Sequence, residues 1–156
     1  MSMVRPDILF LCSAALRRIF LSLGMSILPL SSLRVILLRL LGVKIGRGCY
    51  VGFNIYVDTN FPSMIAIGDN VTISHGCYFV THTMSPVTSP LSRIYQDVKP
   101  VVIQDGAWIG MNSLLLPGSF VHSNSMVGAG SVVTGYLPPN HLCVGNPCRA
   151  IRKLDL

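Results

Sequence analysis

From Val43 onward the chain is built from units of six residues whose third position is apolar. The units run VKIGRG, CYVGFN and IYVDTN, then IAIGDN, VTISHG and CYFVTH, and later from VVIQDG to SVVTGY. A period of six fits neither a helix nor a plain amphipathic strand, but suits a chain that runs straight and then turns a corner. Three such edges close one triangular coil. The pattern therefore predicts an all-β solenoid, a parallel β-helix of about four to five coils.

The positions beside the apolar residues fit the corners and the interior of such a coil. The residue after each apolar position is small or polar, as at Gly46 and Gly52, and glycine permits backbone angles that other residues resist. First positions are mostly small or β-branched, as a crowded interior requires. The apolar third positions are Ile45, Val51, Val57, Ile67, Ile73, Phe79, Ile103, Ile109, Leu115, Val121, Val127 and Val133.

The repeat is interrupted twice, and the interruptions suggest where a functional site lies. Residues 61–64 are inserted between two units and predict a small bulge that shapes a wall of the site. Residues 83–100, which include three prolines, predict a loop that projects from the solenoid. The chain then divides into an N-terminal helical segment (1–42), a β-helix domain (43–137) and a C-terminal segment (138–156).

The N-terminal segment is apolar and carries five arginines and one acidic residue. Residues 8–30 are long enough to suggest a membrane span, but Arg17 and Arg18 lie in the middle, where each charge would cost about 2.5–3.5 kcal/mol. We therefore expect neither a transmembrane helix nor, without a small-residue cleavage motif, a secretory signal.

The end of this segment predicts a helix from Leu33 to Leu41. Ser31 or Ser32 is the expected N-cap, and Gly42 is placed to end the helix. Two compatible interpretations remain open for the segment. It packs across the end of the solenoid, or it lies in a membrane interface with its arginines facing lipid phosphates.

Charge and cysteine content bear on the expected partners and the cellular compartment. The 156 residues carry a net charge of +6, but the charges gather at the two ends and leave the repeat without a basic stripe, so we expect no nucleic-acid partner. The five cysteines form no C-x-x-C pair, and Cys49 and Cys77 fall at first positions of units. We interpret them as small buried thiols in a reducing compartment, which favours the cytoplasm.

Three stretches together resemble a known family. The units IAIGDNVTISHGCYFVTH, the later VVIQDGAWIGMNSLLLPG and the ending SMVGAGSVVTGYLPPNHLCVGNPCRAIRKL look like the hexapeptide-repeat acyltransferases, close to the maltose, galactoside and polysaccharide O-acetyltransferases. The resemblance covers about Leu41 to Lys153. It implies a left-handed β-helix and a homotrimer with active sites between subunits. It also implies transfer of an acetyl group from acetyl-CoA to a saccharide hydroxyl, in bacterial surface-polysaccharide biosynthesis.

His82 is the candidate catalytic residue. It closes the unit CYFVTH directly before the long loop, at the place that matches the family's catalytic histidine. A neutral imidazole can take the proton of an attacking hydroxyl near neutral pH. His75 is a second candidate, either for contact with the acceptor or for a structural role. The two histidines lack the spacing of the zinc ligands in γ-class carbonic anhydrases, so we expect no metal.

The resemblance also assigns residues to the two substrates. Polar residues of the early coils would bind the acceptor sugar, namely Asn54, Tyr56, Asp58 and Asn60. Cations near the chain end, Arg149, Arg152 and Lys153, would meet the nucleotide end of coenzyme A. The positions that match the pantetheine contacts are Met111, Ala129, Thr134 and Gly135. The backbone N–H of Gly110 would lie near the thioester carbonyl and stabilise charge there, while Trp108 either packs on the coil or contacts the donor.

Two other functions remain open. One is an N-acetyltransferase that acts on an amino sugar. The other is a noncatalytic β-helix scaffold, which predicts no binding of coenzyme A and no effect of His82→Ala. The apolar, arginine-bearing N-terminus further suggests a lipid-linked acceptor and peripheral contact of residues 1–42 with the inner face of the cell membrane.

Overall fold

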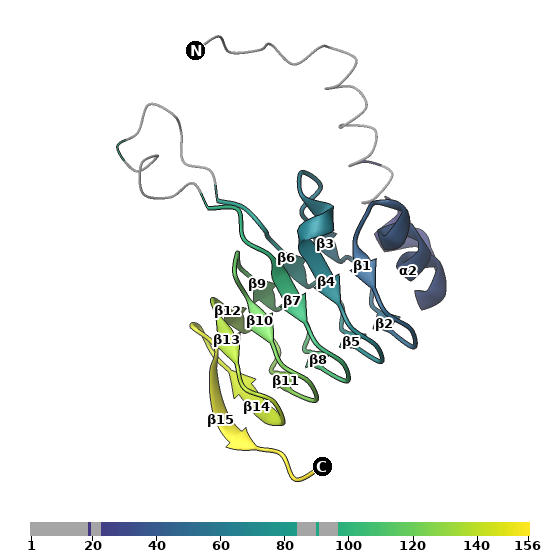
Figure 1. Cartoon of the computed structure of the whole chain (residues 1–156). Helices are drawn as coiled ribbons and strands as arrows, with labels where there is room; N and C mark the ends of the chain where they lie inside the picture. The colour runs from purple at the N-terminus through teal and green to yellow at the C-terminus, as the bar shows by residue number, and fades with distance from the viewer. Residues whose placement is uncertain (1–18, 20–22, 84–89, 91–96) are drawn as a thin grey trace.

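A computed structural model of the chain describes residue 19, residues 23–83, residue 90 and residues 97–156. The described part is a stack of triangular coils with a helical segment at one end and a β-hairpin at the other (Figure 1). From β1 to β14, successive strands along the chain join different sheets, so the chain winds around three sheets in turn.

The three sheets form the faces of the solenoid, and all strand pairs except β14–β15 are parallel. Sheet A contains β1 (Lys44–Ile45), β4 (Ile65–Ile67), β7 (Val101–Ile103), β10 (Phe120–Val121) and β13 (Tyr136–Leu137). Sheet B contains β2 (Tyr50–Val51), β5 (Thr72–Ile73), β8 (Trp108–Ile109), β11 (Met126–Val127), β14 (His141–Val144) and β15 (Arg149–Lys153). Sheet C contains β3 (Tyr56–Val57), β6 (Tyr78–Phe79), β9 (Leu114–Leu115) and β12 (Val132–Val133).

The register follows the six-residue repeat. Ile103 lies beside Val121, three units further along the chain, and Ile109 lies beside Val127 in the same way. Eleven of the twelve apolar third positions are buried, and Ile45, in the first coil, is half-buried. The predicted core is confirmed, because a regular repeat places equivalent side chains one above another.

Buried serines occupy the first positions of the later coils, where the interior is narrow. Ser113 Oγ donates to Gly110 O at 2.8 Å, and Ser125 Oγ donates to Pro138 O at 2.6 Å. These hydroxyls therefore satisfy corner carbonyls that lie inside the solenoid. Cys77, Cys143 and Cys148 are also buried, as expected for small interior thiols, whereas Cys49, at the first position of its unit, is only half-buried.

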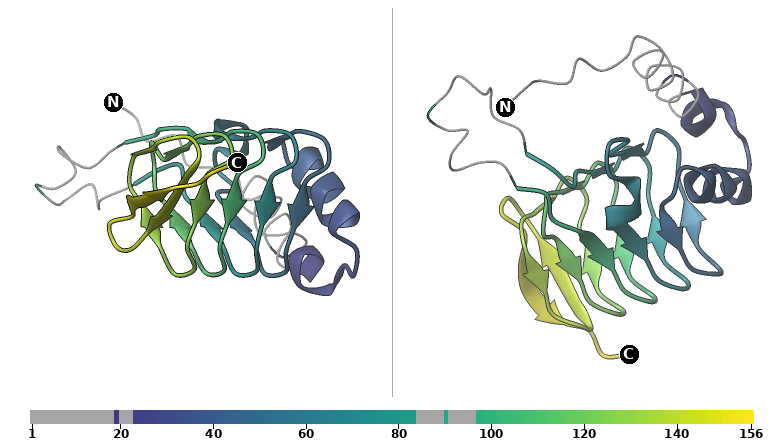
Figure 2. Two further views of the ribbon diagram at one scale, coloured as in Figure 1. Left: turned by 90° about the horizontal axis from the view of Figure 1, so that it is seen from below. Right: turned by 45° about the horizontal axis from the view of Figure 1, so that its top comes forward.

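The helix α2 (Ser31–Leu40) lies across the end of the first coil, against β1 and β2 (Figure 2). It buries Val35, Leu37 and Leu38 against the solenoid. The predicted helix is confirmed, and Gly42 follows its end with a φ of 100°. The predicted serine cap is wrong. Ser31 lies inside the helix, and its Oγ accepts a hydrogen bond from Val51 N at 2.8 Å.

Two of the N-terminal arginines bind the solenoid. Arg34 is fully buried and donates from Nε to Val51 O at 2.9 Å, while Arg39 Nε donates to Ile45 O at 3.1 Å. The expectation that the arginines face lipid phosphates is therefore wrong for Arg34, which is buried against the first coil, whereas Arg39 is exposed and the expectation stays a prediction there. Arg5, Arg17 and Arg18 lie outside the described residues.

The C-terminal segment continues the solenoid rather than forming a separate part. Strand β14 adds to sheet B beside β11, and β15 folds back antiparallel to β14. Figure 2 shows this hairpin at the end of the stack opposite α2. In the part of the chain that the structure describes, no helix is both long and apolar enough to cross a membrane.

Candidate active site

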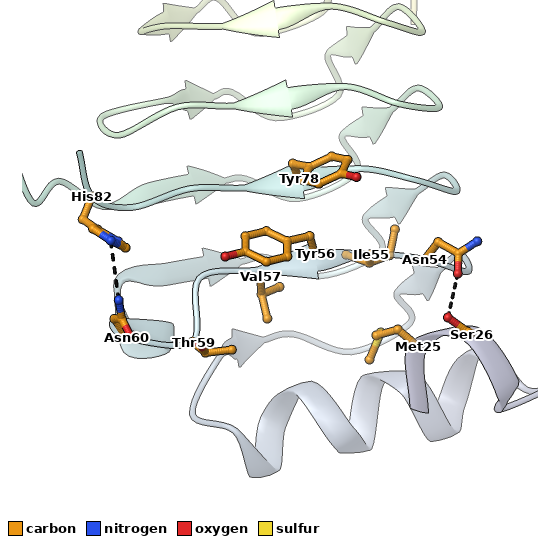
Figure 3. A pocket seen from close by; sticks show the side chains of 10 residues that line it. All are labelled: Met25, Ser26, Asn54, Ile55, Tyr56, Val57, Thr59, Asn60, Tyr78 and His82. Carbon is orange, nitrogen blue, oxygen red and sulfur yellow. Dashed lines mark hydrogen bonds between the residues drawn. The ribbon is translucent and has the colours of Figure 1, made fainter. Parts of the chain in front are cut away.

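A pocket of about 580 Å³ lies over the outer face of β3, on sheet C (Figure 3). One end is formed by the corner that carries His82, and the other by the helical residues 23–27 and the corner that carries Asn54. The pocket is lined by Met25, Ser26, Asn54, Ile55, Tyr56, Val57, Thr59, Asn60, Tyr78 and His82.

His82 is held by a buried carboxylate. Its Nδ1 lies in hydrogen-bond contact with Asp58 Oδ2, and Asp58 is only 2% exposed. An ionised carboxylate can only accept, so this contact requires the proton on Nδ1 and leaves the lone pair on Nε2. A histidine in this tautomer can accept a proton at Nε2.

Asp58 is held in turn by three further hydrogen bonds. Thr81 donates to Asp58 Oδ2 from its hydroxyl at 2.6 Å and from its backbone N–H at 3.2 Å, and Asn60 N donates to Oδ1 at 3.0 Å. Burial raises the pKa of the Asp58 carboxyl, but the hydrogen bonds from Thr81, His82 and Asn60 outweigh it and leave that pKa below its usual value. Asp58 is thus a carboxylate at neutral pH.

The other nitrogen of His82 faces the pocket beside Asn60. Asn60 Nδ2 lies 3.5 Å from His82 Nε2, and the ring of Phe61 packs edge-on against the imidazole at 5.5 Å between centroids. Phe61 begins the four-residue insertion, which forms the 3₁₀ turn η1 (Pro62–Met64). Phe61 thus contacts the candidate base, but residues 61–64 do not line the pocket, and the predicted wall of the site stays a prediction.

The two ends of the long loop pair with each other next to His82. His82 pairs with Val98 in an antiparallel bridge, and Thr83 N donates to Asp97 O at 2.9 Å. The two ends of the loop therefore fix the backbone of His82. Most of the loop predicted at 83–100 lies outside the described residues.

The predicted acceptor residues are only partly brought together. Asn54, Tyr56 and Asn60 line the pocket, and Asp58 lies behind His82. His75 lies at a different corner, where its ring stacks on Phe53 at 5.3 Å between centroids, outside the pocket. A role for His75 in acceptor binding stays a prediction.

Six pocket residues were not predicted as site residues, namely Met25, Ser26, Ile55, Val57, Thr59 and Tyr78. Tyr78 lies one coil beyond Tyr56, with 5.6 Å between ring centroids, and its equivalent place in the repeat could have revealed it. Met25 and Ser26 come from the N-terminal segment. No pattern in the sequence links them to the third sheet, since only packing of the helical residues places them there.

The predicted donor residues lie on two edges of the solenoid. Met111 and Ala129 occupy the corner between sheets B and C, and Gly130 N donates to Met111 O at 2.7 Å across the two coils. Thr134 and Gly135 lie at the corner between sheets C and A, the edge that carries His82. A single chain therefore does not gather them into one groove.

The other predicted donor residues lie along sheet B. Trp108 is 48% exposed on β8, and its indole N–H donates to Ser74 Oγ at 3.1 Å. Arg149, Arg152 and Lys153 lie exposed on β15. The indole therefore packs on the coil and keeps an exposed face.

The expectation for Gly110 needs a correction. Its N–H donates to Val127 O at 2.8 Å, so this amide already belongs to the ladder between coils and cannot also bind a thioester oxygen. Among the described residues, the next amide, that of Met111, has no hydrogen-bond partner. In the described part of the chain, no group of three His, Cys, Asp or Glu side chains is arranged to hold a metal ion.

The six-residue repeat of this parallel β-helix is shared with a class of known proteins. The family model described as "Hexapeptide repeat of succinyl-transferase" matches residues 34–59 and 100–135. The galactoside O-acetyltransferase of Escherichia coli (strain K12) is 35% identical over 114 residues, which is 72% of this chain and 55% of that protein. The chain thus spans little more than half the length of this relative.

Solved structures of acetyltransferases are also similar to this chain. A maltose O-acetyltransferase from Clostridium difficile 630 is 28% identical with a TM-score of 0.65, and the alignment covers 96% of this chain and 90% of that one. A galactoside acetyltransferase in complex with coenzyme A is 28% identical with a TM-score of 0.60, over 96% and 86% of the two chains.

The chain belongs to the hexapeptide-repeat acyltransferase family. The expected left-handed parallel β-helix is confirmed, with four complete coils and a fifth that ends in β14.

Proposed function

We propose that this protein transfers an acetyl group from acetyl-CoA to a hydroxyl of a saccharide. The observation that carries the proposal is the contact between His82 and Asp58 at the end of an open pocket. The named relatives, which act as galactoside and maltose O-acetyltransferases, support the same donor and the same class of acceptor.

In this mechanism His82 Nε2 takes the proton of the attacking hydroxyl as its oxygen bonds to the thioester carbonyl carbon. Asp58 holds the tautomer and stabilises the imidazolium that forms. When the C–S bond breaks, the leaving sulfur takes the proton from His82, which restores the neutral base. The N–H of Met111 is a suitable donor to the developing oxyanion.

Transfer is direct, without an acyl-enzyme. Of the four described thiols, Cys77, Cys143 and Cys148 are buried, and burial raises the pKa of each, that of Cys143 to about 11. These three are therefore poor nucleophiles, and none of them lines the pocket. The fourth, Cys49, is half-buried and does not line the pocket either.

The active unit is a homotrimer with sites between subunits. The two edges that flank sheet C support this, since one carries His82 and Gly135 while the other carries Met111 and Ala129. Donor contacts from one subunit would meet the base of its neighbour. The exposed cations Arg149, Arg152 and Lys153 would bind the phosphates of coenzyme A.

The acceptor is a glycan of bacterial surface-polysaccharide biosynthesis, linked to a lipid at the inner face of the membrane. An apolar stripe on the outer side of α2 supports membrane contact, because Leu33, Ile36 and Leu40 are all exposed there. The helix follows Met25 and Ser26, which line the pocket, by a few residues in the sequence.

The first test is calorimetric titration with acetyl-CoA. Removing two phosphate-binding cations in Arg149→Ala/Arg152→Ala should weaken binding by roughly tenfold or more. The control Lys44→Ala/Arg47→Ala removes the same charge at the other end of the solenoid and should bind as the wild type does. No heat of binding in the folded wild-type protein would favour a scaffold instead.

An assay of acetyl transfer tests the catalytic role of His82 and distinguishes O-acetylation from N-acetylation. His82→Ala should lower kcat by roughly 100-fold or more while the control His122→Ala stays active. Mild alkali should release acetate from the product, because esters are labile and amides are not. An alkali-stable product would instead identify an N-acetyltransferase.

A further inference from the structure

The imidazole of His82 has two fixed neighbours, a carboxylate and an aromatic ring. Asp58 Oδ2 binds Nδ1, and the centroid of the Phe61 ring lies 5.5 Å from that of the imidazole, with 68° between the two planes. The χ2 angle of histidine has a broad energy minimum, so one hydrogen bond at Nδ1 leaves the tilt of the ring loosely defined. The contact with Phe61 limits that tilt, and with it the direction of Nε2.

Phe61 lies outside the core of the solenoid. Its side chain is 37% exposed, and none of the residues of η1, which follows it, is buried. Among the described aromatic and histidine rings, Phe61 packs against that of His82 alone. A phenyl ring at the surface adds little to the hydrophobic core, so the contact with the imidazole is the main interaction of this side chain.

The backbone around Phe61 is itself fixed. On one side, Asn60 N donates to Asp58 Oδ1 at 3.0 Å, so the carboxylate that binds the imidazole also holds the chain directly before Phe61. On the other side, a Cβ built on Gly42, the glycine that follows α2, would lie 3.7 Å from Pro62 Cγ. The insertion therefore packs beside the end of α2, and Phe61 is held between this contact and the carboxylate.

We propose that Phe61 is a positioning residue, whose ring fixes the tilt of the His82 imidazole so that Nε2 stays aimed at the acceptor hydroxyl. The inference rests on the proposed function and deepens it, because it gives the four-residue insertion a part in the chemical step. Phe61 does not line the pocket, so it acts through His82 and not on the substrate. A misplacement of about 1 Å can cost roughly 100-fold in rate, and looser positioning costs part of that.

The kinetic experiment measures steady-state transfer of acetyl groups from acetyl-CoA to methyl hexopyranosides. Phe61→Leu keeps an apolar side chain but removes the flat ring. It should lower kcat by roughly tenfold and leave the KM of both substrates within about twofold. Phe61→Tyr keeps the ring and should retain kcat within about twofold of the wild type. The matched control is Phe120→Leu, which removes a ring that packs at 4.8 Å against a different imidazole, that of His122.

Two further measurements separate positioning from a general structural role. In a His82→Ala background, Phe61→Leu should leave the residual rate unchanged within about twofold, because the ring then has no imidazole to hold. The melting temperature of Phe61→Leu should stay within about 2 °C of the wild type, because the side chain lies outside the core. An equal loss of rate in both backgrounds would show a general structural role and overturn the inference.

A third measurement needs no acceptor. In protein labelled with ¹⁵N-histidine, the proton between His82 Nδ1 and Asp58 should give a downfield imidazole signal in the wild type and in Phe120→Leu. In Phe61→Leu this signal should broaden and exchange faster with water, because the imidazole is less firmly held.

The outcomes are distinct. Kinetics and a His82 signal in Phe61→Leu that match those of Phe120→Leu would overturn the inference and leave the proposed function standing. A wild-type protein that transfers acetyl groups to none of these sugars would contradict the saccharide acceptor. The His82 signal would then still decide whether Phe61 holds the imidazole.

Discussion

The guanidinium of Arg34 lies 4.1 Å from the centroid of the Phe53 ring, in a fully buried position between α2 and the first coil. Its N–H groups donate to the carbonyl groups of Val51 and Leu28. Among the described residues no carboxylate neutralises this charge. The arginine therefore joins the N-terminal segment to the solenoid through carbonyl groups and an aromatic face.

Removal of this arginine should loosen the helical end of the molecule. We expect Arg34→Ala to lower the free energy of unfolding by about 2–4 kcal/mol, because it leaves a cavity and two unpaired carbonyl groups. Urea unfolding at fixed protein concentration measures the change. Arg47→Ala, at a side chain 93% exposed, should alter stability little. Equal stability of the two variants would contradict the structural role of Arg34.

Replacement of Asp58 should affect the chemical step. In Asp58→Asn the side chain can no longer hold the Nδ1–H tautomer of His82, so kcat should fall by roughly 100- to 10,000-fold. The KM for acetyl-CoA should stay within about twofold, since Asp58 does not line the pocket. Steady-state kinetics measures both constants. A loss confined to KM would show that Asp58 binds substrate instead.

Asp58 should also stabilise the fold in a pH-dependent way. Because its pKa is lower in the folded protein than the unfolded value of 3.8, its contribution is complete above that value. The contribution is lost as the pH falls through the folded-state pKa. The difference in unfolding free energy between wild type and Asp58→Asn should therefore be larger at about pH 5 than at about pH 3. A difference that grows on acidification would have the wrong sign.

Two glycines of the predicted donor site should respond differently to a methyl group. A Cβ on Gly110 would lie 2.6 Å from Ala129 N and from Val127 O, both backbone atoms, whereas a Cβ on Gly135 meets nothing within 4 Å. Gly110→Ala should cost about 1–3 kcal/mol through crowding. Gly135→Ala should stay within about 0.5 kcal/mol of the wild type, and thermal unfolding distinguishes the two.

The repeat explains why so much of the solenoid was predictable. Each six-residue unit forms a short strand followed by a corner. Val51, Ile73 and Ile109 could therefore be placed in one stack from their equivalent positions in the repeat alone. The regular period also made it possible to predict the place of His82, at the end of a unit and before a loop. The equivalence of Tyr78 with Tyr56 was equally present in the repeat.

Other parts of the site depend on contacts between distant segments. The sequence determined the β-helix, its core and the candidate base, because these follow from a short local period. Only the tertiary structure decided that Asp58 holds His82, that Arg34 is buried instead of facing lipid, and that Ser26 reaches Asn54. The contacts of Arg34 and Ser26 arise where α2 and the helical residues before it pack on the open first coil, whereas Asp58 meets His82 between the first and second coils. No periodic pattern encodes which side chains meet at these places.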